Sequence, residues 1–179
     1  LHSCRDKYCY AAKIARRFGT NFTAKRTLHE LDKPMQKITK TGDIMSDPYP
    51  YGFDPTFHRY RLSEPAKVNT PSIIGVVYMG DLFGQWVPYS WIQEVYTACQ
   101  KADHHQYIFL TKNPKRYCEI YRSELDYRCY MWFGATATDE DSFNRVGYDL
   151  FVSTGCETKR HANRFLSIEP LVGKISSTT

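Results

Sequence analysis

Continuous apolar runs separated by helical patterns are the feature of this sequence that most restricts its fold. Three runs rich in β-branched and aromatic residues stand out and a fourth is weaker: Ser72–Met79, Gln106–Leu110, Cys129–Ala135 and Arg164–Ile168. Strands without polar alternation are typical of parallel sheets, because such sheets are covered on both faces. Each run therefore predicts one strand of a parallel α/β sheet.

Helical spacing fills the segments between these runs. Val87–Lys101 repeats apolar residues on one face, Asn113–Pro114 combines an N-cap with a first-turn proline, and Thr138–Asp141 resembles a capping box. The resulting order β-α-β-α-β-α-β implies parallel strands joined by right-handed crossovers. Periodicity alone is compatible with a closed barrel and with an open doubly wound sheet. We expect a single domain over residues 1–179.

The segment Thr20–Pro71 departs from this alternation. It contains six of the nine prolines and the aromatic stretch Pro48–Arg61. An irregular segment of this length in a compact protein is usually a lid or a binding loop, and we predict a lid. The alternative is a structural strap whose aromatic rings cover one end of the core.

Composition limits the class of partner. A net charge of +5 suits an anionic partner such as nucleic acid, but it is equally compatible with an ordinary soluble surface. No apolar run approaches the ~20 residues of a membrane helix. Six cysteines in a chain of 179 residues do not indicate a small disulfide-rich domain. We therefore expect no membrane partner and a cytoplasmic location.

Two thiols near the start of the sequence are the clearest sign of metal chemistry. Cys4 and Cys9 lie five positions apart in a polar segment, and an amphipathic helical pattern follows from Ala11 to Phe18. Thiolates are soft ligands that suit zinc and iron–sulfur clusters. Two cysteines cannot complete such a site, so zinc, a disulfide or no ligand at all are each admissible on this evidence.

Five blocks of the sequence support a more specific hypothesis: Cys4–Ala12, Met79–Pro88, Phe109–Tyr117, Trp132–Thr136 and Arg164–Leu171. In this order they resemble a family of phage-associated radical-SAM-like proteins of unassigned function, most closely its branch with a three-Cys motif. The resemblance covers most of the chain. It implies a (β/α) barrel, complete or partial, that holds a [4Fe–4S] cluster and S-adenosylmethionine.

The resemblance also implies the cluster ligands. Cys4 and Cys9 would bind the cluster, and Tyr8 matches the aromatic residue that precedes the last cysteine of the C-x3-C-x2-C signature and packs near the adenine. The spacing differs from that signature, because four residues separate the two cysteines and the first cysteine of the signature is absent. We expect that cysteine immediately before Leu1, and we expect both ends of the sequence to be truncated.

Polar residues at the ends of the predicted strands complete the candidate site. In a parallel barrel, functional groups collect at the C-terminal ends of the strands. The resemblance implies that the Gly-rich acidic segment at the end of the first strand meets the methionine amino group of S-adenosylmethionine with a glycine backbone, beside a carboxylate. Taken singly, each residue has a structural alternative: Asp81 as a loop cap, Lys112 as a surface charge and Glu169 as a solvated carboxylate. The predicted cofactor-binding residues are Tyr8, Met79, Gly80, Asp81, Lys112, Thr136 and Glu169.

The implied activity is reductive cleavage of S-adenosylmethionine to a 5′-deoxyadenosyl radical, which abstracts hydrogen from a substrate. The substrate is not named by the sequence. Basic residues interleaved with aromatic ones over His58–Arg61 would suit a nucleic acid or a nucleotide. The alternative function is a non-catalytic barrel, stabilised by zinc or an iron–sulfur cluster, that binds nucleic acid or a partner protein.

Overall fold

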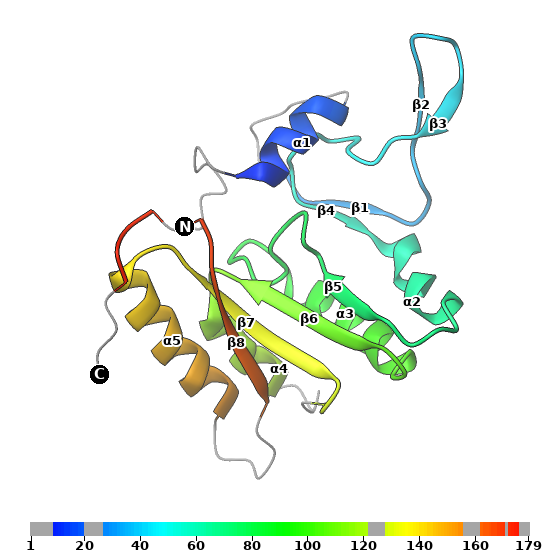
Figure 1. Ribbon diagram of the computed structural model, residues 1–179. Helices are drawn as coiled ribbons and strands as arrows, with labels where there is room; N and C mark the ends of the chain where they lie inside the picture. Colours follow the sequence, from blue (N-terminus) through cyan, green and yellow to red (C-terminus); the bar gives the residue numbers. More distant parts are fainter. Residues whose placement is uncertain (1–8, 20–26, 122–127, 156–161, 171, 176–179) are drawn as a thin grey trace. The chain divides into compact units, whose positions relative to one another are not determined.

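In the computed structural model the described residues fall into two compact units, one within Ser3–Glu64 and the other within Pro65–Thr179. The boundary between them falls inside the segment Thr20–Pro71 that the sequence distinguishes from the rest. The described residues are 9–19, 27–121, 128–155, 162–170 and 172–175 (Figure 1).

The larger unit is built on a four-stranded parallel sheet whose strands are neighbours in chain order. These strands are β5 (Ile73–Val76), β6 (Gln106–Thr111), β7 (Met131–Ala137) and β8 (Asn163–Ile168). The predicted α/β class with parallel strands is confirmed. Strand β5 ends three residues before the predicted Met79, because Val77 leaves the extended conformation with a φ of 56°. The described residues form an open sheet and not a closed barrel.

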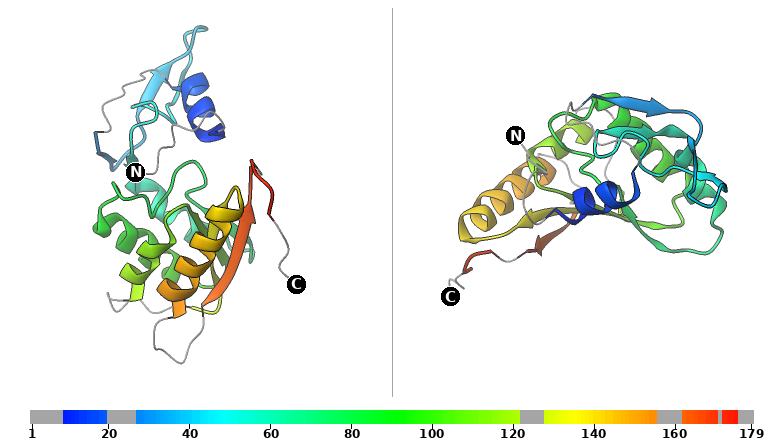
Figure 2. Two further views of the ribbon diagram at one scale, coloured as in Figure 1. Left: turned by 90° about the vertical axis from the view of Figure 1, so that its left-hand side faces the viewer. Right: turned by 90° about the horizontal axis from the view of Figure 1, so that it is seen from above.

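The helices that connect these strands lie along one face of the sheet (Figure 1, Figure 2). Right-handed crossovers between strands that are adjacent in chain order place every connecting helix on the same side. They are α3 (Tyr89–Lys101), the 3₁₀ turn η2 (Pro114–Tyr117) with α4 (Cys118–Tyr121), and α5 (Glu140–Gly155).

The helix starts differ slightly from those predicted. The helix predicted over Val87–Lys101 begins at Tyr89, and Pro88 is its N-cap. At α5 the capping side chain is that of Asp139, whose carboxylate accepts the backbone N–H of Ser142 at 2.8 Å. The predicted cap at Thr138 is therefore displaced by one residue, because Asp139 places its carboxylate within reach of that N–H.

The core lies between the sheet and these helices and is mainly aromatic. Phe109 of β6 and Phe133 of β7 are stacked with their ring centroids 5.3 Å apart. Tyr117 packs edge-on against Phe133 and donates its hydroxyl proton to the carbonyl of Gly134 at 2.8 Å. The buried hydroxyl is thus satisfied, which burial of a tyrosine requires.

The smaller unit contains α1 (Tyr10–Phe18) and strands of three residues each. Strands β1 (His29–Leu31) and β4 (Thr56–His58) are parallel, whereas β2 (Gln36–Ile38) and β3 (Ile44–Ser46) form an antiparallel hairpin. The turn η1 (Arg59–Ser63) and the short helix α2 (Glu64–Lys67) lead to the larger unit. Across the described residues, no helix is both long enough and apolar enough to span a membrane.

Candidate functional site at the carboxyl ends of the strands

The loop after β5 begins with an unusual backbone conformation. Val77 is β-branched, and a φ of 56° is a strained conformation for such a residue. The N–H of Gly80 bonds to the carbonyl of Val77 at 3.1 Å and closes a turn. This turn lays the ring of Tyr78 against Gly75, where a Cβ atom would lie 2.8 Å from Tyr78 Cε2. Strain of this kind is often found at functional sites.

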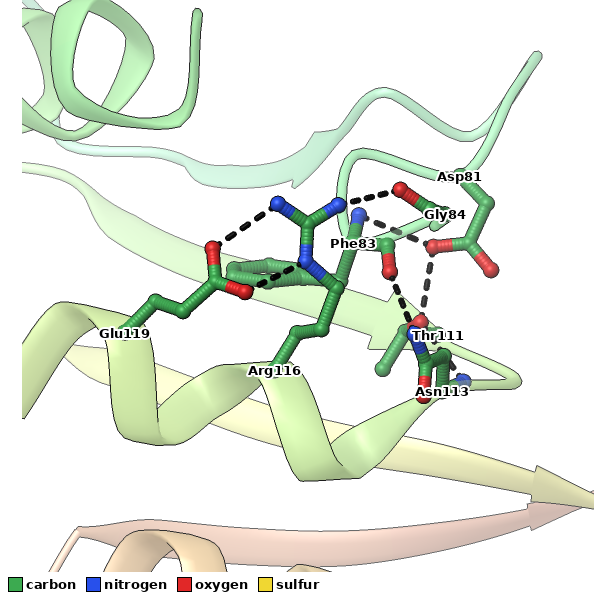
Figure 3. A network of polar contacts seen from close by, with 7 residues as sticks. All are labelled: Asp81, Phe83, Gly84, Thr111, Asn113, Arg116 and Glu119. Atoms are coloured by element: carbon green, nitrogen blue, oxygen red, sulfur yellow. Dashed lines mark hydrogen bonds and ion pairs between the residues drawn. The ribbon is translucent and has the colours of Figure 1, made fainter. Parts of the chain in front are cut away.

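The carboxylate of Asp81 joins this loop to the end of β6 (Figure 3). Its Oδ1 accepts the N–H of Phe83 at 3.0 Å and the hydroxyl proton of Thr111 at 2.7 Å. Its Oδ2 accepts the backbone N–H of Lys112 at 3.1 Å. Both carboxylate oxygens are thus engaged within the protein, so Asp81 acts as the cap of the loop.

A second set of contacts holds the far end of the same loop (Figure 3). The guanidinium of Arg116 donates to the carbonyl of Gly84 and forms a two-pronged pair with Glu119, at 2.7 and 2.8 Å. The side-chain amide of Asn113 donates to the carbonyl of Phe83 at 3.0 Å. The loop Asp81–Gly84 is therefore fixed by residues of the next βα unit.

Sequence reasoning predicted Asn113 only as an N-cap and assigned no role to Thr111 or Arg116. All three lie in the block Phe109–Tyr117. Their partners are about 30 positions away in the chain. No periodicity or spacing rule connects positions that far apart, so only the folded chain identifies the contacts.

Two further predicted residues, Lys112 and Thr136, share one edge and one face of the sheet. Thr136 pairs in register with Ser167, and Lys112 follows Thr111, which pairs with Ala135. Because side chains alternate along a strand, Lys112 and Thr136 fall on the face opposite the helices. Lys112 and Thr136 are half-buried.

Glu169 follows β8 at this edge and is exposed. Its Oε1 accepts the hydroxyl proton of Ser167 at 2.8 Å. The pKa of the Tyr78 hydroxyl is raised, first by burial and then by the negative charge of Glu169. The loop after β5 and the end of β8 are thus coupled electrostatically. Met79 and Gly80, in that loop, are exposed.

The thiol motif lies in the smaller unit, and Cys4 and Tyr8 are outside the described residues. Cys9 is the N-cap of α1, and its sulfur accepts the N–H of Ala12 at 3.4 Å. The thiol is half-buried and free. Hydrogen bonds to sulfur are one means by which proteins tune iron–sulfur clusters, so this position suits a thiolate ligand. Within the described ranges, no group of three His, Cys, Asp or Glu side chains is arranged to hold a metal.

Two arginines of the predicted lid, Arg59 and Arg61, are paired with acidic residues. Arg59 contacts Glu30 at 2.8 Å and Asp32 at 3.1 Å, and Arg61 contacts Glu64 at 2.9 Å. Both guanidinium groups thus have carboxylate partners within their own unit. The lid remains a prediction, and its basic residues would have to exchange these partners to contact a phosphate.

The aromatic residues of the same segment also make contacts within it. The rings of His29 and Tyr51 are stacked 3.7 Å apart and nearly parallel. His58 lies 3.2 Å from the hydroxyl of Tyr60. Burial and the charge of Arg61 lower the pKa of His58, while Glu64 acts weakly in the opposite direction. Tyr51 and Tyr60 therefore help to hold the smaller unit together.

These features define an α/β protein with a parallel sheet whose polar side chains gather at the carboxyl ends of its strands, the usual location of function in such folds. The chain belongs to the family described as "Protein of unknown function (DUF5131)", whose family model matches residues 2–179. No curated protein and no solved structure matches it.

Proposed function

We propose that this protein is a radical S-adenosylmethionine enzyme of the phage-associated kind that its sequence resembles. Cys4 and Cys9 would hold a [4Fe–4S] cluster. When bound, the cluster supplies the electron for reductive cleavage of S-adenosylmethionine to a 5′-deoxyadenosyl radical, which acts on the substrate. The residues assigned to S-adenosylmethionine are Tyr8, Met79, Gly80, Asp81, Lys112, Thr136 and Glu169.

One observation carries this proposal: four parallel strands follow one another in chain order, with their helices on one face and polar residues at their carboxyl ends. This is the arrangement of successive βα units in a barrel, whether complete or partial. At this edge, the ammonium of Lys112 suits a carboxylate and the carboxylate of Glu169 suits an ammonium. Asp81 would contribute by holding the loop that presents Met79 and Gly80.

Gly80 provides a direct probe of the cofactor site. A Cβ atom there would meet only Val77 Cγ1, at the ordinary contact distance of 3.5 Å. The fold therefore has room for a side chain at Gly80, and a requirement for glycine would come from a ligand approaching the backbone. Gly80→Ala should weaken S-adenosylmethionine binding without lowering the melting temperature. Gly147→Ala is the matched control, since a Cβ atom there lies 3.8 Å from Leu166.

A second candidate function is favoured by the contacts of Asp81. Because three internal donors satisfy its carboxylate, the position of Asp81 is explained by the fold alone. The second candidate is a non-catalytic module that is stabilised by zinc or an iron–sulfur cluster and binds nucleic acid or a partner protein. Such a module needs Asp81 only as a structural residue. In either case a cytoplasmic location would keep the thiols reduced.

Anaerobic purification and reconstitution of the full-length protein distinguishes the two functions. The enzyme should be brown, absorb near ~400 nm, contain iron and sulfide, and convert S-adenosylmethionine to methionine and 5′-deoxyadenosine when reduced. A colourless protein with bound zinc would establish the module instead. Cys4→Ala and Cys9→Ala should abolish iron incorporation, whereas Cys99→Ala and Cys118→Ala should retain it. Equal iron content in all four variants would exclude the cluster assignment.

A further inference from the structure

The face of the parallel sheet opposite the helices carries three aromatic side chains. Trp132 of β7 and Phe165 of β8 fall on this face by strand alternation, and the ring of Tyr78 lies on it over Gly75. Tyr78 and Trp132 expose 46% and 38% of their surface. Half-buried Ile108 and Leu110 of β6 lie between them on the same face. Together they form an apolar floor of Tyr78, Ile108, Leu110, Trp132 and Phe165.

Two glycines make room for rings on this floor. A Cβ atom at Gly134 would lie 2.2 Å from Phe165 Cζ, and one at Gly75 would lie 2.8 Å from Tyr78 Cε2. Any larger residue at either position would displace the ring. Glycine in a strand often marks such a close approach. The rings therefore lie against the backbone, and the floor is built from strand positions and not from loops.

Polar side chains border the floor at the carboxyl ends of the strands. Lys112, Thr136 and Ser167 are in one row across three neighbouring strands, and Ser167 bonds to Glu169. The row has a cation at its β6 end and a carboxylate at its β8 end. The β6 and β8 ends of the row are two strand spacings, or about 10 Å, apart. A ligand bound across the row would thus meet opposite charges at its two ends.

We propose that this face binds a purine mononucleotide. The base stacks on the aromatic floor, Lys112 pairs with the phosphate, and the carboxylate of Glu169 accepts a ribose hydroxyl proton. The aromatic floor complements the planar base, and Lys112 complements the phosphate. The hydroxyls of Thr136 and Ser167 complement the ribose hydroxyl groups. Lys112 and Glu169 are also residues assigned to S-adenosylmethionine, so the nucleotide and S-adenosylmethionine would compete for this edge of the sheet. Nucleotide binding itself requires neither the cluster nor S-adenosylmethionine.

Adenosine 5′-monophosphate is the probe, titrated calorimetrically into the full chain purified in air without reconstitution. Removing the ring that the base covers, while keeping an apolar side chain, should weaken binding by about 5- to 150-fold, as loss of one stacked base contact predicts. Phe165→Leu and Tyr78→Leu are measured separately, because these rings lie over β7 and β5, two strand spacings or about 10 Å apart, and one base covers only one of them. Tyr148→Leu is the control, because this tyrosine lies on α5 and is 70% exposed. The melting temperature of each variant separates lost binding from lost folding.

Lys112→Gln separates the phosphate from the base. It should weaken binding of adenosine 5′-monophosphate at least 5-fold and leave adenosine binding unchanged. The proposal is wrong if the native chain binds no adenosine 5′-monophosphate at millimolar concentration, or if folded Tyr78→Leu and Phe165→Leu bind it as tightly as Tyr148→Leu does. Because the titration is done without a cluster, absence of S-adenosylmethionine cleavage in the reconstituted protein would leave this result unaffected.

Discussion

The hydroxyl of Thr111 donates a 2.7 Å hydrogen bond to the carboxylate of Asp81, and this contact ties the end of β6 to the loop that follows β5. Thr111 is only 2% exposed, so the bond is largely shielded from water. Since Asp81 also accepts two backbone N–H groups, the loop is held at one point by three donors. This makes Asp81 a positioning residue for the exposed backbone at Met79 and Gly80.

Thr111→Val should lower the free energy of unfolding by about 1–3 kcal/mol, because hydrogen bonds to charged groups are the stronger ones. Valine keeps the shape of threonine, but it removes one donor to Asp81 and the acceptor of the Asn113 N–H. Urea denaturation measures the change. The control is Thr136→Val, at a half-buried position on the open face, where the change should stay within about 0.5 kcal/mol. Equal losses in both variants would contradict the role of the Asp81 contact.

Arg116→Ala should destabilise the protein by about 2–3 kcal/mol. The Arg116 side chain is 14% exposed and that of Glu119 is 30% exposed, so the substitution leaves a partly buried carboxylate without its cation. It also removes one of the two donors to the Gly84 carbonyl, which still accepts the N–H of Val87. Arg61 and Glu64 form a pair with the same spacing but are 61% and 51% exposed. Arg61→Ala should therefore cost only about 0–1 kcal/mol. Chemical denaturation of the two variants side by side tests whether burial sets the difference.

His105→Ala should cost about 2–4 kcal/mol, whereas His104→Ala should cost less than about 1 kcal/mol. His105 is 1% exposed; its Nδ1 accepts the N–H of Ser72 at 3.1 Å and its Nε2 donates to the carbonyl of Pro65 at 3.0 Å. His104 is exposed, and its Nε2 lies 2.8 Å from the carbonyl oxygen of Val68. Thermal unfolding would reveal the contrast, and a smaller loss for His105→Ala than for His104→Ala would refute it.

Burial raises the pKa of the Cys99 thiol from 9.0 to about 12. The unfolded chain releases this proton near pH 9 while the folded chain keeps it, so the contribution of Cys99 to stability is present below pH 9 and is lost as the pH rises toward 12. Burial of Tyr107 raises the pKa of its hydroxyl and acts in the same direction. Cys99→Ala should therefore flatten part of the alkaline loss of stability, measured by urea denaturation from pH 8 to 11.

The same burial predicts the order of thiol labelling. At pH 8 a maleimide or iodoacetamide should modify the exposed Cys129 readily and leave Cys99 unmodified until the chain unfolds. Peptide mapping by mass spectrometry identifies the modified residue. Labelling of both thiols at similar rates in the native protein would show that Cys99 is accessible.

The sequence by itself determined the α/β class and the order of the elements in the larger unit. Apolar runs such as Gln106–Leu110, and helical spacing such as that of Val87–Lys101, are local patterns, and each predicts its own element from residues a few positions apart. The same local signals placed Lys112, Thr136 and Glu169 at strand ends. Parallel pairing then brings those ends to one edge of the sheet.

Only the tertiary structure decided what these residues contact. The bond from Thr111 to Asp81 joins positions 30 apart, and the ring of Phe165 covers a glycine 31 positions earlier in the chain. Likewise, Arg59 pairs with Glu30 of β1, 29 positions earlier, and with Asp32, 27 positions earlier. Such contacts follow from strand register and from the path of the loops. Local periodicity repeats every two or 3.6 residues, so it reports which face of an element a residue occupies and not its partners far away in the chain.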